Sequence, residues 1–246
     1  MVSARPFSGN TFSPVVLKTY STTFSLTENP ISEGGAWHAS GLGLDRTDIG
    51  QAALPASSTP VVTASGIAHG VSAATSASGF DDGRALLSGF RADHACTATI
   101  SSSGANGTFS EVEIHLRFDD SGTYARGYEL FWSAFGQYLT VVRWNGDGSY
   151  NYLYQFGSTS APVSGDVFYG EIKGNLLTCK INGVRMFTLD ITAANGAALP
   201  FTLGNANMAG DGSSLVFSNG NPGIGFDTDG NDAAFGFTDL FVTELA

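Results

Sequence analysis

The stretch from Phe109 to Phe156 reads FSEVEIHLRFDDSGTYARGYELFWSAFGQYLTVVRWNGDGSYNYLYQF. Its runs FSEVEIHLRF, RGYELFW, QYLTVVRW and YNYLYQF alternate apolar with polar residues or are rich in β-branched and aromatic residues. Turn sequences such as FDDSG and NGDG separate these runs. The stretch therefore predicts consecutive antiparallel strands with no helix between them.

The same pattern continues on both sides of this stretch. Before it lie YSTTFSLT, TPVVTASGIAHGVSAA and HACTATI, and after it lie DVFYGEIK, NLLTCKIN, VRMFTLD and GFTDLFVTEL. The dipeptide Asn182–Gly183 is a two-residue hairpin signal between two of these runs. Regular strand spacing without helical periodicity predicts an all-β protein, an antiparallel β-sandwich or jelly roll.

The predicted domain organisation is simple. Residues 1–18 predict an irregular arm, because Pro6, Gly9 and Pro14 interrupt any regular pattern there. Residues 19–246 predict a single jelly-roll domain without a linker, charge block or repeat.

Composition and charge limit the partners. Of the 246 residues, 42% are hydrophobic, 12% aromatic and 13% charged, and the formal net charge is −11. Such a chain repels nucleic acid and anionic membranes, and no lysine or arginine cluster offsets the repulsion. If the partner is a glycan, the charge favours a neutral polysaccharide.

The order FSEVEIHLRF, GYELFW, YLTVVRWNGDGSYNYL, GDVFYGEIKGNLLTCKINGVRMFTLD, GNPGIGF and a last aromatic strand resembles the concanavalin A-like lectin/glucanase superfamily. The resemblance is closest from Phe109 to Leu245. It implies an antiparallel β-sandwich of the concanavalin A-like jelly-roll type with one concave sheet. Its members include lectins, carbohydrate-binding modules, glycoside hydrolases, polysaccharide lyases and adhesion or virion domains, so the fold leaves the activity open.

One strand carries a row of ionisable residues. In SEVEIHLRF, alternation places Glu111, Glu113, His115 and Arg117 on one face. The resemblance implies two enzyme hypotheses here: a glucanase-like ExDxxE pattern with His115 replacing its third carboxylate, and a lyase-like histidine in EIH. The alternative is a solvent-facing row of weak cross-strand ion pairs. We therefore assign no catalytic residue, and name these four only for the case that the protein is an enzyme.

Aromatic side chains are the better candidates for ligand binding. Sugar rings have apolar faces that stack on tryptophan and tyrosine, while arginine supplies hydrogen-bond donors to hydroxyl groups. The three alternating tyrosines of YNYLYQF form the best group. The candidate ligand-binding residues are Arg126, Tyr128, Trp132, Arg143, Trp144, Tyr150, Tyr152 and Tyr154.

The segment DTDGND predicts a structural calcium site with Asp227, Asp229 and Asp232 as ligands. An EF-hand is excluded, because Asp232 stands where the loop needs glycine and Thr238 stands where it needs glutamate. A solvated turn without metal is the alternative.

Cys96 and Cys179 both fall on the apolar face of their strands, and a disulfide and two buried free thiols are both compatible with that placement.

The leading functional hypothesis is a non-enzymatic carbohydrate-binding or adhesion domain. We expect it to act outside the cell or on a virion surface as a head, fibre or tail decoration protein. No signal peptide is visible in this chain. We expect the arm to contact neighbouring subunits, either in a homo-oligomer or in a virion. The rival hypothesis is a polysaccharide lyase or glycoside hydrolase acting in the concave groove.

Overall fold

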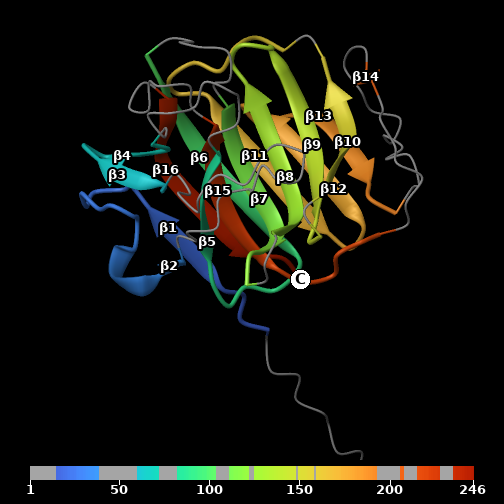
Figure 1. Cartoon of the computed structure of the whole chain (residues 1–246), viewed down its shortest axis with the longest axis horizontal. Helices are drawn as coiled ribbons and strands as arrows, with labels where there is room; N and C mark the ends of the chain where they lie inside the picture. Colours follow the sequence, from blue (N-terminus) through green and yellow to red (C-terminus); the bar gives the residue numbers. More distant parts are fainter. Residues whose placement is uncertain are drawn as a thin grey trace, which may run out of the picture.

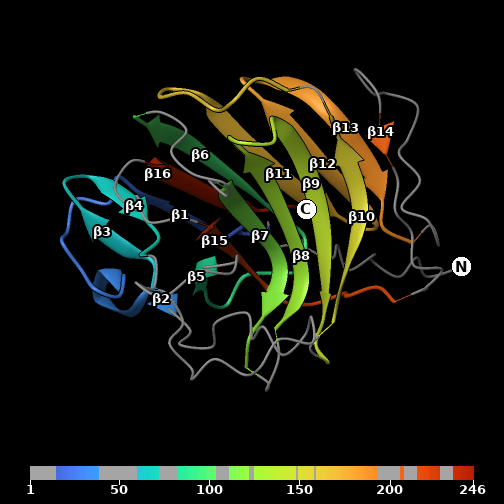
Figure 2. The same cartoon turned by 45° about the horizontal axis from the view of Figure 1, so that its top comes forward.

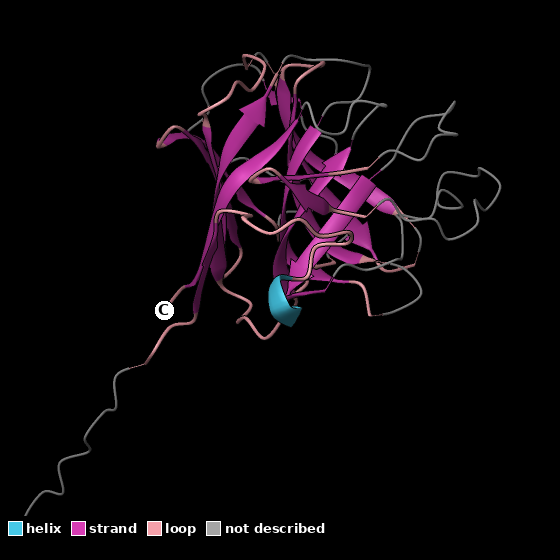
Figure 3. Ribbon diagram, turned by 90° about the vertical axis from the view of Figure 1, so that its left-hand side faces the viewer, coloured by secondary structure: helices cyan, strands magenta, loops and turns pink. Residues whose placement is uncertain are grey.

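The computed structural model describes residues 15–38, 60–71, 82–103, 111–121, 125–147, 149–157, 159–192, 206–207, 215–227 and 235–246. These residues form sixteen strands and one three-residue 3-10 turn, Glu33–Gly35. The strands make two eight-stranded sheets that pack face to face (Figure 1; Figure 3 shows the layers from the side). The predicted all-β sandwich is confirmed. Among the described residues, no helix has the length and hydrophobicity needed to cross a bilayer.

The first sheet has the strand order β13-β12-β11-β6-β16-β4-β3, and β1 also pairs with β16. Its strands are β1 (Thr19–Thr22), β3 (Val62–Ala64), β4 (Ile67–His69), β6 (His94–Ser102), β11 (Val167–Lys173), β12 (Leu176–Ile181), β13 (Val184–Asp190) and β16 (Phe235–Glu244).

The second sheet has the order β14-β10-β9-β8-β7-β15-β5-β2, and all pairings between named strands are antiparallel in both sheets. In Figures 1 and 2, β7 to β10 lie in front of β11 to β13. Its strands are β2 (Trp37–His38), β5 (Asp82–Leu87), β7 (Glu111–Asp119), β8 (Arg126–Ser133), β9 (Tyr138–Asn145), β10 (Tyr150–Phe156), β14 (Ala206–Asn207) and β15 (Asn221–Asp227).

The main core lies between the sheets. Alternation along β7 sends Val112, Ile114 and Leu116 into it, and all three are fully buried. From the opposite sheet, Phe168 and Leu240 enter the same core. The residues that alternate with Val112, Ile114 and Leu116 must therefore project from the outer face of the second sheet, where the candidate site lies.

Turn chemistry explains how the strands connect. Asn182 and Gly183 have φ values of 51° and 77°, the left-handed pair that a tight hairpin turn between β12 and β13 requires, so the predicted hairpin is confirmed. The run TPVVTASGIAHGVSAA contains two strands, because Ser65 and Gly66 make a similar turn between β3 and β4. Among the described strands, β2, β5 and β14 lie in no segment that was predicted as a strand.

The two cysteines are free and buried. Cys96 on β6 and Cys179 on β12 both lie opposite Gly170 of β11, the strand between them. With strands about 4.8 Å apart, the two Cα atoms are separated by about 10 Å. A disulfide needs a Cα–Cα separation of about 7 Å or less, so Cys96 and Cys179 are too far apart to form one and remain two free thiols.

The end of the predicted arm is attached to the last strand. Lys18 donates its backbone N–H to the Glu244 carboxylate at 2.9 Å, and its carbonyl accepts the Glu244 N–H at 2.9 Å. Residues 1–14 lie outside the described residues. The boundary of the domain at residue 18 stays a prediction.

Candidate functional site

The ionisable row of β7 points outward, but it is not solvent-facing. Glu111, Glu113 and His115 share the outer face, as predicted from alternation. Glu113 is 1% exposed and His115 is 0% exposed. Their burial contradicts the alternative of a solvated row of surface charges.

Arg117 does not share that face, which corrects the four-residue row. A bulge between Leu116 and Asp119 shifts the register of β7, and Arg117 takes a positive φ of 49° there. Its guanidinium instead donates to the Asp93 carboxylate at 2.7 Å. It also donates to the backbone carbonyls of Ala92, Gly174 and Phe217. Arg117 therefore joins segments of the sandwich and is absent from the outer face.

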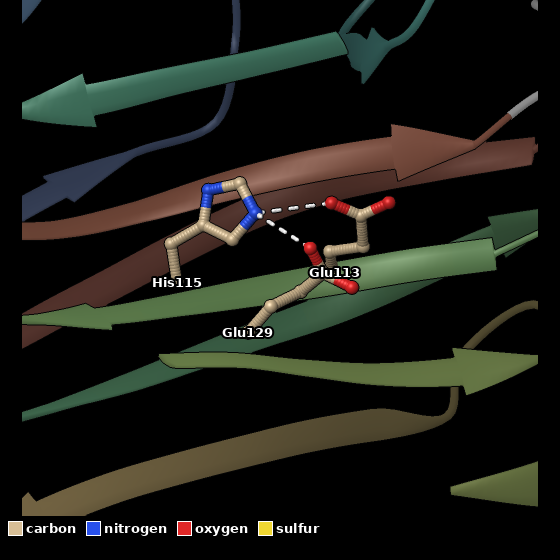
Figure 4. A group of neighbouring side chains, drawn as sticks. All are labelled: Glu113, His115 and Glu129. Atoms are coloured by element: carbon tan, nitrogen blue, oxygen red, sulfur yellow. Dashed lines mark hydrogen bonds and ion pairs between the residues drawn. The ribbon is translucent and has the colours of Figure 1, made fainter. Parts of the chain in front are cut away.

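Glu129 on β8 completes a buried cluster with Glu113 and His115 (Figure 4). His115 lies directly opposite Glu129 in the β7–β8 register. Its Nε2 is 3.0 Å from Glu113 Oε2 and 3.9 Å from Glu129 Oε2. Two carboxylates thus converge on one imidazole nitrogen.

Aromatic neighbours fix two members of this cluster. The Trp144 indole Nε1–H donates to Glu129 Oε2 at 2.7 Å, and the His115 ring stacks on Phe118 with centroids 4.3 Å apart. Burial, and secondarily the positive charge of Arg84, holds the pKa of His115 well below its usual value. The imidazole is therefore neutral at physiological pH.

Glu111 and Asp227 lie opposite each other at one end of this face. Both are buried, and Asp227 is 1% exposed. Burial raises the pKa of Tyr138, and the negative charges of Glu111 and Asp227 raise it further. Asp227 is the described member of the predicted calcium site, and Asp229 and Asp232 lie outside the described residues. The calcium site stays a prediction.

Three of the predicted aromatic ligand-binding residues lie in the core. Tyr128, Trp132 and Tyr154 are at most 1% exposed. The Tyr128 hydroxyl accepts the backbone N–H of Phe217, and Trp132 Nε1–H donates to the Ser160 carbonyl. Their ring faces are packed against protein, so a sugar cannot stack on them.

A bulge separates Tyr154 from the other two tyrosines of its strand. The pairing of β10 with β9 shifts between Tyr152 and Tyr154, which turns Tyr154 into the core beside Leu153. Tyr150 and Tyr152 remain on the outer face. The expectation that all three share one face is therefore wrong for Tyr154.

The structure brings Trp144, Tyr150 and Tyr152 together in one aromatic row. The rings of Trp144 and Tyr150 have centroids 5.0 Å apart, and those of Tyr150 and Tyr152 are 5.5 Å apart. Exposure rises along the row, from 9% at Trp144 to 42% at Tyr152. The row begins at Glu129 of the buried cluster and ends at the protein surface.

The two predicted arginines hold local structure. Arg126 pairs with Asp119 at 2.8 Å in a partly exposed position. Arg143 is 2% exposed and donates to the side chains of Asn145 and Asn151 and to the Leu215 carbonyl. Neither guanidinium joins the outer-face cluster.

The sequence analysis did not identify two residues of the candidate site, Glu129 and Gly225. Glu129 was read only as part of GYELFW, although a single carboxylate in an otherwise apolar strand is itself a signal of a buried polar site. Gly225 lies opposite Glu113 on β15, and a Cβ there would be 2.1 Å from Glu113 Oε2. Its role depends on a contact between strands distant in sequence.

Comparisons with known proteins find similarity in structure alone. No protein-family model matches the chain, and no curated protein matches it in sequence. A glycoside hydrolase family 16 endo-glucanase from Bacteroides ovatus aligns with a TM-score of 0.51 and 11% identity, over 91% of this chain and 99% of that chain.

Two further solved structures have the same architecture. The CBM2 module of the evolved Dit of Lactobacillus casei BL23 phage J-1 has a TM-score of 0.50 and 13% identity, over 94% and 97% of the two chains. The VIP36 exoplasmic/lumenal domain in its Ca2+/Man2-bound form has a TM-score of 0.50 and 11% identity, over 93% and 89%. Together with the two antiparallel sheets, these alignments show that the chain has the concanavalin A-like jelly-roll fold.

Proposed function

We propose that the outer face of the second sheet binds a neutral glycan through the aromatic row Trp144, Tyr150 and Tyr152. The observation that carries this proposal is the row itself, which leads from a buried acidic cluster to a ring that is 42% exposed at Tyr152. A pyranose ring stacks its C–H face on such a side chain, and neighbouring polar groups bind its hydroxyls.

Charge supports a neutral ligand. The outer face carries the carboxylates Glu111, Glu113, Glu129 and Asp227 and one cation of the same row, Arg84, and the whole chain has a net charge of −11. An anionic polysaccharide approaching this face would be repelled, and the repulsion would decrease with added salt. Binding of a neutral glycan should therefore depend little on ionic strength.

The related structures are consistent with a glycan partner and a place outside the cell. The VIP36 domain is an exoplasmic/lumenal domain that was solved with Man2, and the Dit module belongs to a phage protein. We place this domain outside the cell or on a virion surface, as a carbohydrate-binding or adhesion module. Neighbouring subunits of an oligomer or virion would then contact its other surfaces.

A glycan panel tests the proposal with a matched pair of variants. Tyr152→Ala removes the exposed ring of the row, whereas Phe241→Ala removes a ring of similar exposure, 45%, from β16 in the opposite sheet. We expect wild type and Phe241→Ala to bind the same neutral glycan equally. Tyr152→Ala should bind about tenfold more weakly, or about 1.4 kcal/mol, as expected for one aromatic contact.

The contrary outcomes are distinct. No binding to any neutral glycan, or equal loss in both variants, would contradict the proposed site. If a polysaccharide instead released reducing or unsaturated ends, and Glu113→Gln abolished that release, the enzyme hypothesis would replace simple binding.

A further inference from the structure

The cluster of Glu113, His115 and Glu129 has the dimensions of a metal centre. One ligand atom from each side chain lies within 4.8 Å of the other two. Around a tetrahedral ion with bonds of about 2.0–2.1 Å, ligand atoms are about 3.3 Å apart. The observed separations of 3.0 Å and 3.9 Å from His115 Nε2 lie on either side of that value. The two carboxylate oxygens lie within 4.8 Å of each other, so ion binding would draw them closer together.

We propose that Glu113, His115 and Glu129 bind a Zn²⁺ ion on the outer face of the second sheet. The three side chains supply one imidazole nitrogen and two carboxylate oxygens. This leaves a fourth tetrahedral position for water or another ligand. The site is separate in residues and in chemistry from the predicted calcium loop at Asp227.

The donor set selects zinc over calcium. Imidazole is a ligand for zinc and other first-row transition metals, whereas calcium takes six to eight oxygen atoms. Three side chains of the described residues converge here, and one of them is a histidine.

The surroundings hold the ligands in place. Trp144 donates a hydrogen bond to Glu129, and Phe118 stacks on His115, so two of the three side chains are oriented by their neighbours. Gly225 provides the space: a Cβ at this position would be 2.1 Å from Glu113 Oε2 and 2.9 Å from His115 Nε2. Any larger residue would displace both ligands.

Nδ1 of His115 is the atom that would carry the ring proton when Nε2 binds the ion. Nδ1 is buried and has no hydrogen-bond partner among the described residues. No hydrogen bond to Nδ1 among the described residues therefore fixes the tautomer of His115. The proton can move from Nε2 to Nδ1 when Nε2 binds the ion, without release of a proton to solvent.

The experiment counts zinc in the full chain. Because the cluster is buried, the protein is unfolded in urea with a chelator and refolded with or without Zn²⁺, then dialysed. We expect about one zinc ion to remain per wild-type chain and the melting temperature to rise. Glu129→Gln and His115→Gln each remove one ligand with little change of shape, and should weaken zinc binding at least tenfold in a chelator competition.

His38→Gln is the matched control, because His38 is an exposed histidine on β2 of the same sheet. It should retain zinc like the wild type. Nitrogen NMR should show the His115 proton on Nδ1 only in the zinc-loaded protein. The proposal is overturned if folded wild type retains no zinc, if His115→Gln retains it, or if His38→Gln loses it. Zinc is counted without sugar, so this result is independent of glycan binding.

Discussion

A buried neutral histidine, His94, joins the beginning of β6 to the bulge of β7. Its Nδ1 is 2.7 Å from the Arg91 carbonyl, and its Nε2 accepts the backbone N–H of Arg117 at 3.2 Å. This pairing requires the proton on Nδ1. Burial and, to a lesser extent, the positive charge of Arg117 together lower the pKa of His94 to about 4, against the opposing effect of the Arg91 carbonyl.

The pKa of His94 makes stability depend on pH. Between pH 6.5 and about 4 the unfolded chain binds a proton at this histidine and the folded chain does not, so acidification favours unfolding. We expect His94 to account for a loss of about 2 kcal/mol in the free energy of unfolding between pH 7 and pH 4.5. Urea titrations at the two pH values measure it.

His94→Gln separates this effect from other titrations. The variant should be less stable at pH 7, because it loses the two hydrogen bonds, but its stability should fall less on acidification. An unchanged loss in the variant would show that other groups, such as His115 with its lowered pKa, cause the whole pH dependence.

At the residue scale, alternation predicted which side chains share a face but not whether that face is covered. Glu111, Glu113 and His115 share the outer face as predicted. They are buried, however, whereas one of the two alternatives from the sequence was a solvent-facing row. A strand's own sequence carries its period of two. Burial depends on what else packs on the sheet, which the strand alone does not encode.

At the scale of elements, the bulge in β7 depends on two glycines, one in the neighbouring strand β8 and one directly before the other neighbour, β15. Gly127 of β8 has φ of +142°, and a Cβ there would be 2.6 Å from Phe118 Cα. Gly220 precedes β15 with φ of +130°, and a Cβ there would be 2.1 Å from the Arg117 carbonyl oxygen. The two glycines leave the space into which the bulged residues Arg117 and Phe118 protrude.

Gly220→Ala should therefore destabilise the protein strongly. The new methyl group would collide with the backbone of Arg117, in a conformation that L residues already disfavour. We expect a loss of about 3 kcal/mol or more in the free energy of unfolding. Gly165→Ala is the control, because Gly165 also has a positive φ, +91°, but no atom lies within 4 Å of its Cβ position. It should cost about 1 kcal/mol, and equal losses would refute the role given to packing around the bulge.

Bulges also mark the limit of the sequence prediction at this scale. The long strands β6 to β13 were predicted from their periodicity and turns, and the structure contains them. A single inserted residue reverses the face of everything that follows it. That is why Arg117 and Tyr154 were assigned to the wrong face, although the strands that contain them were predicted.

At the scale of the whole molecule, β16 connects distant parts of the chain. It lies within the first sheet, where it pairs with β1, β4 and β6. The Glu244 carboxylate at its end also accepts the backbone N–H groups of Lys18 and Arg91. The beginning and middle of the chain are therefore held by its last strand. The aromatic residues of this strand were one of the sequence features on which the sandwich resemblance was based.

Deletion of residues 235–246 should consequently abolish cooperative folding, rather than merely lower stability. Without β16, strands β1 and β6 would lose the strand with which they pair. The core would also lose the side chains of Phe237, Leu240 and Val242. Tryptophan fluorescence and circular dichroism during urea titration should show no shared sigmoidal transition. Phe241→Ser tests the strand's exposed side and should change stability by about 0.5 kcal/mol or less. A truncated chain that still unfolds in one transition would mean that the second sheet folds without the strand that closes the first.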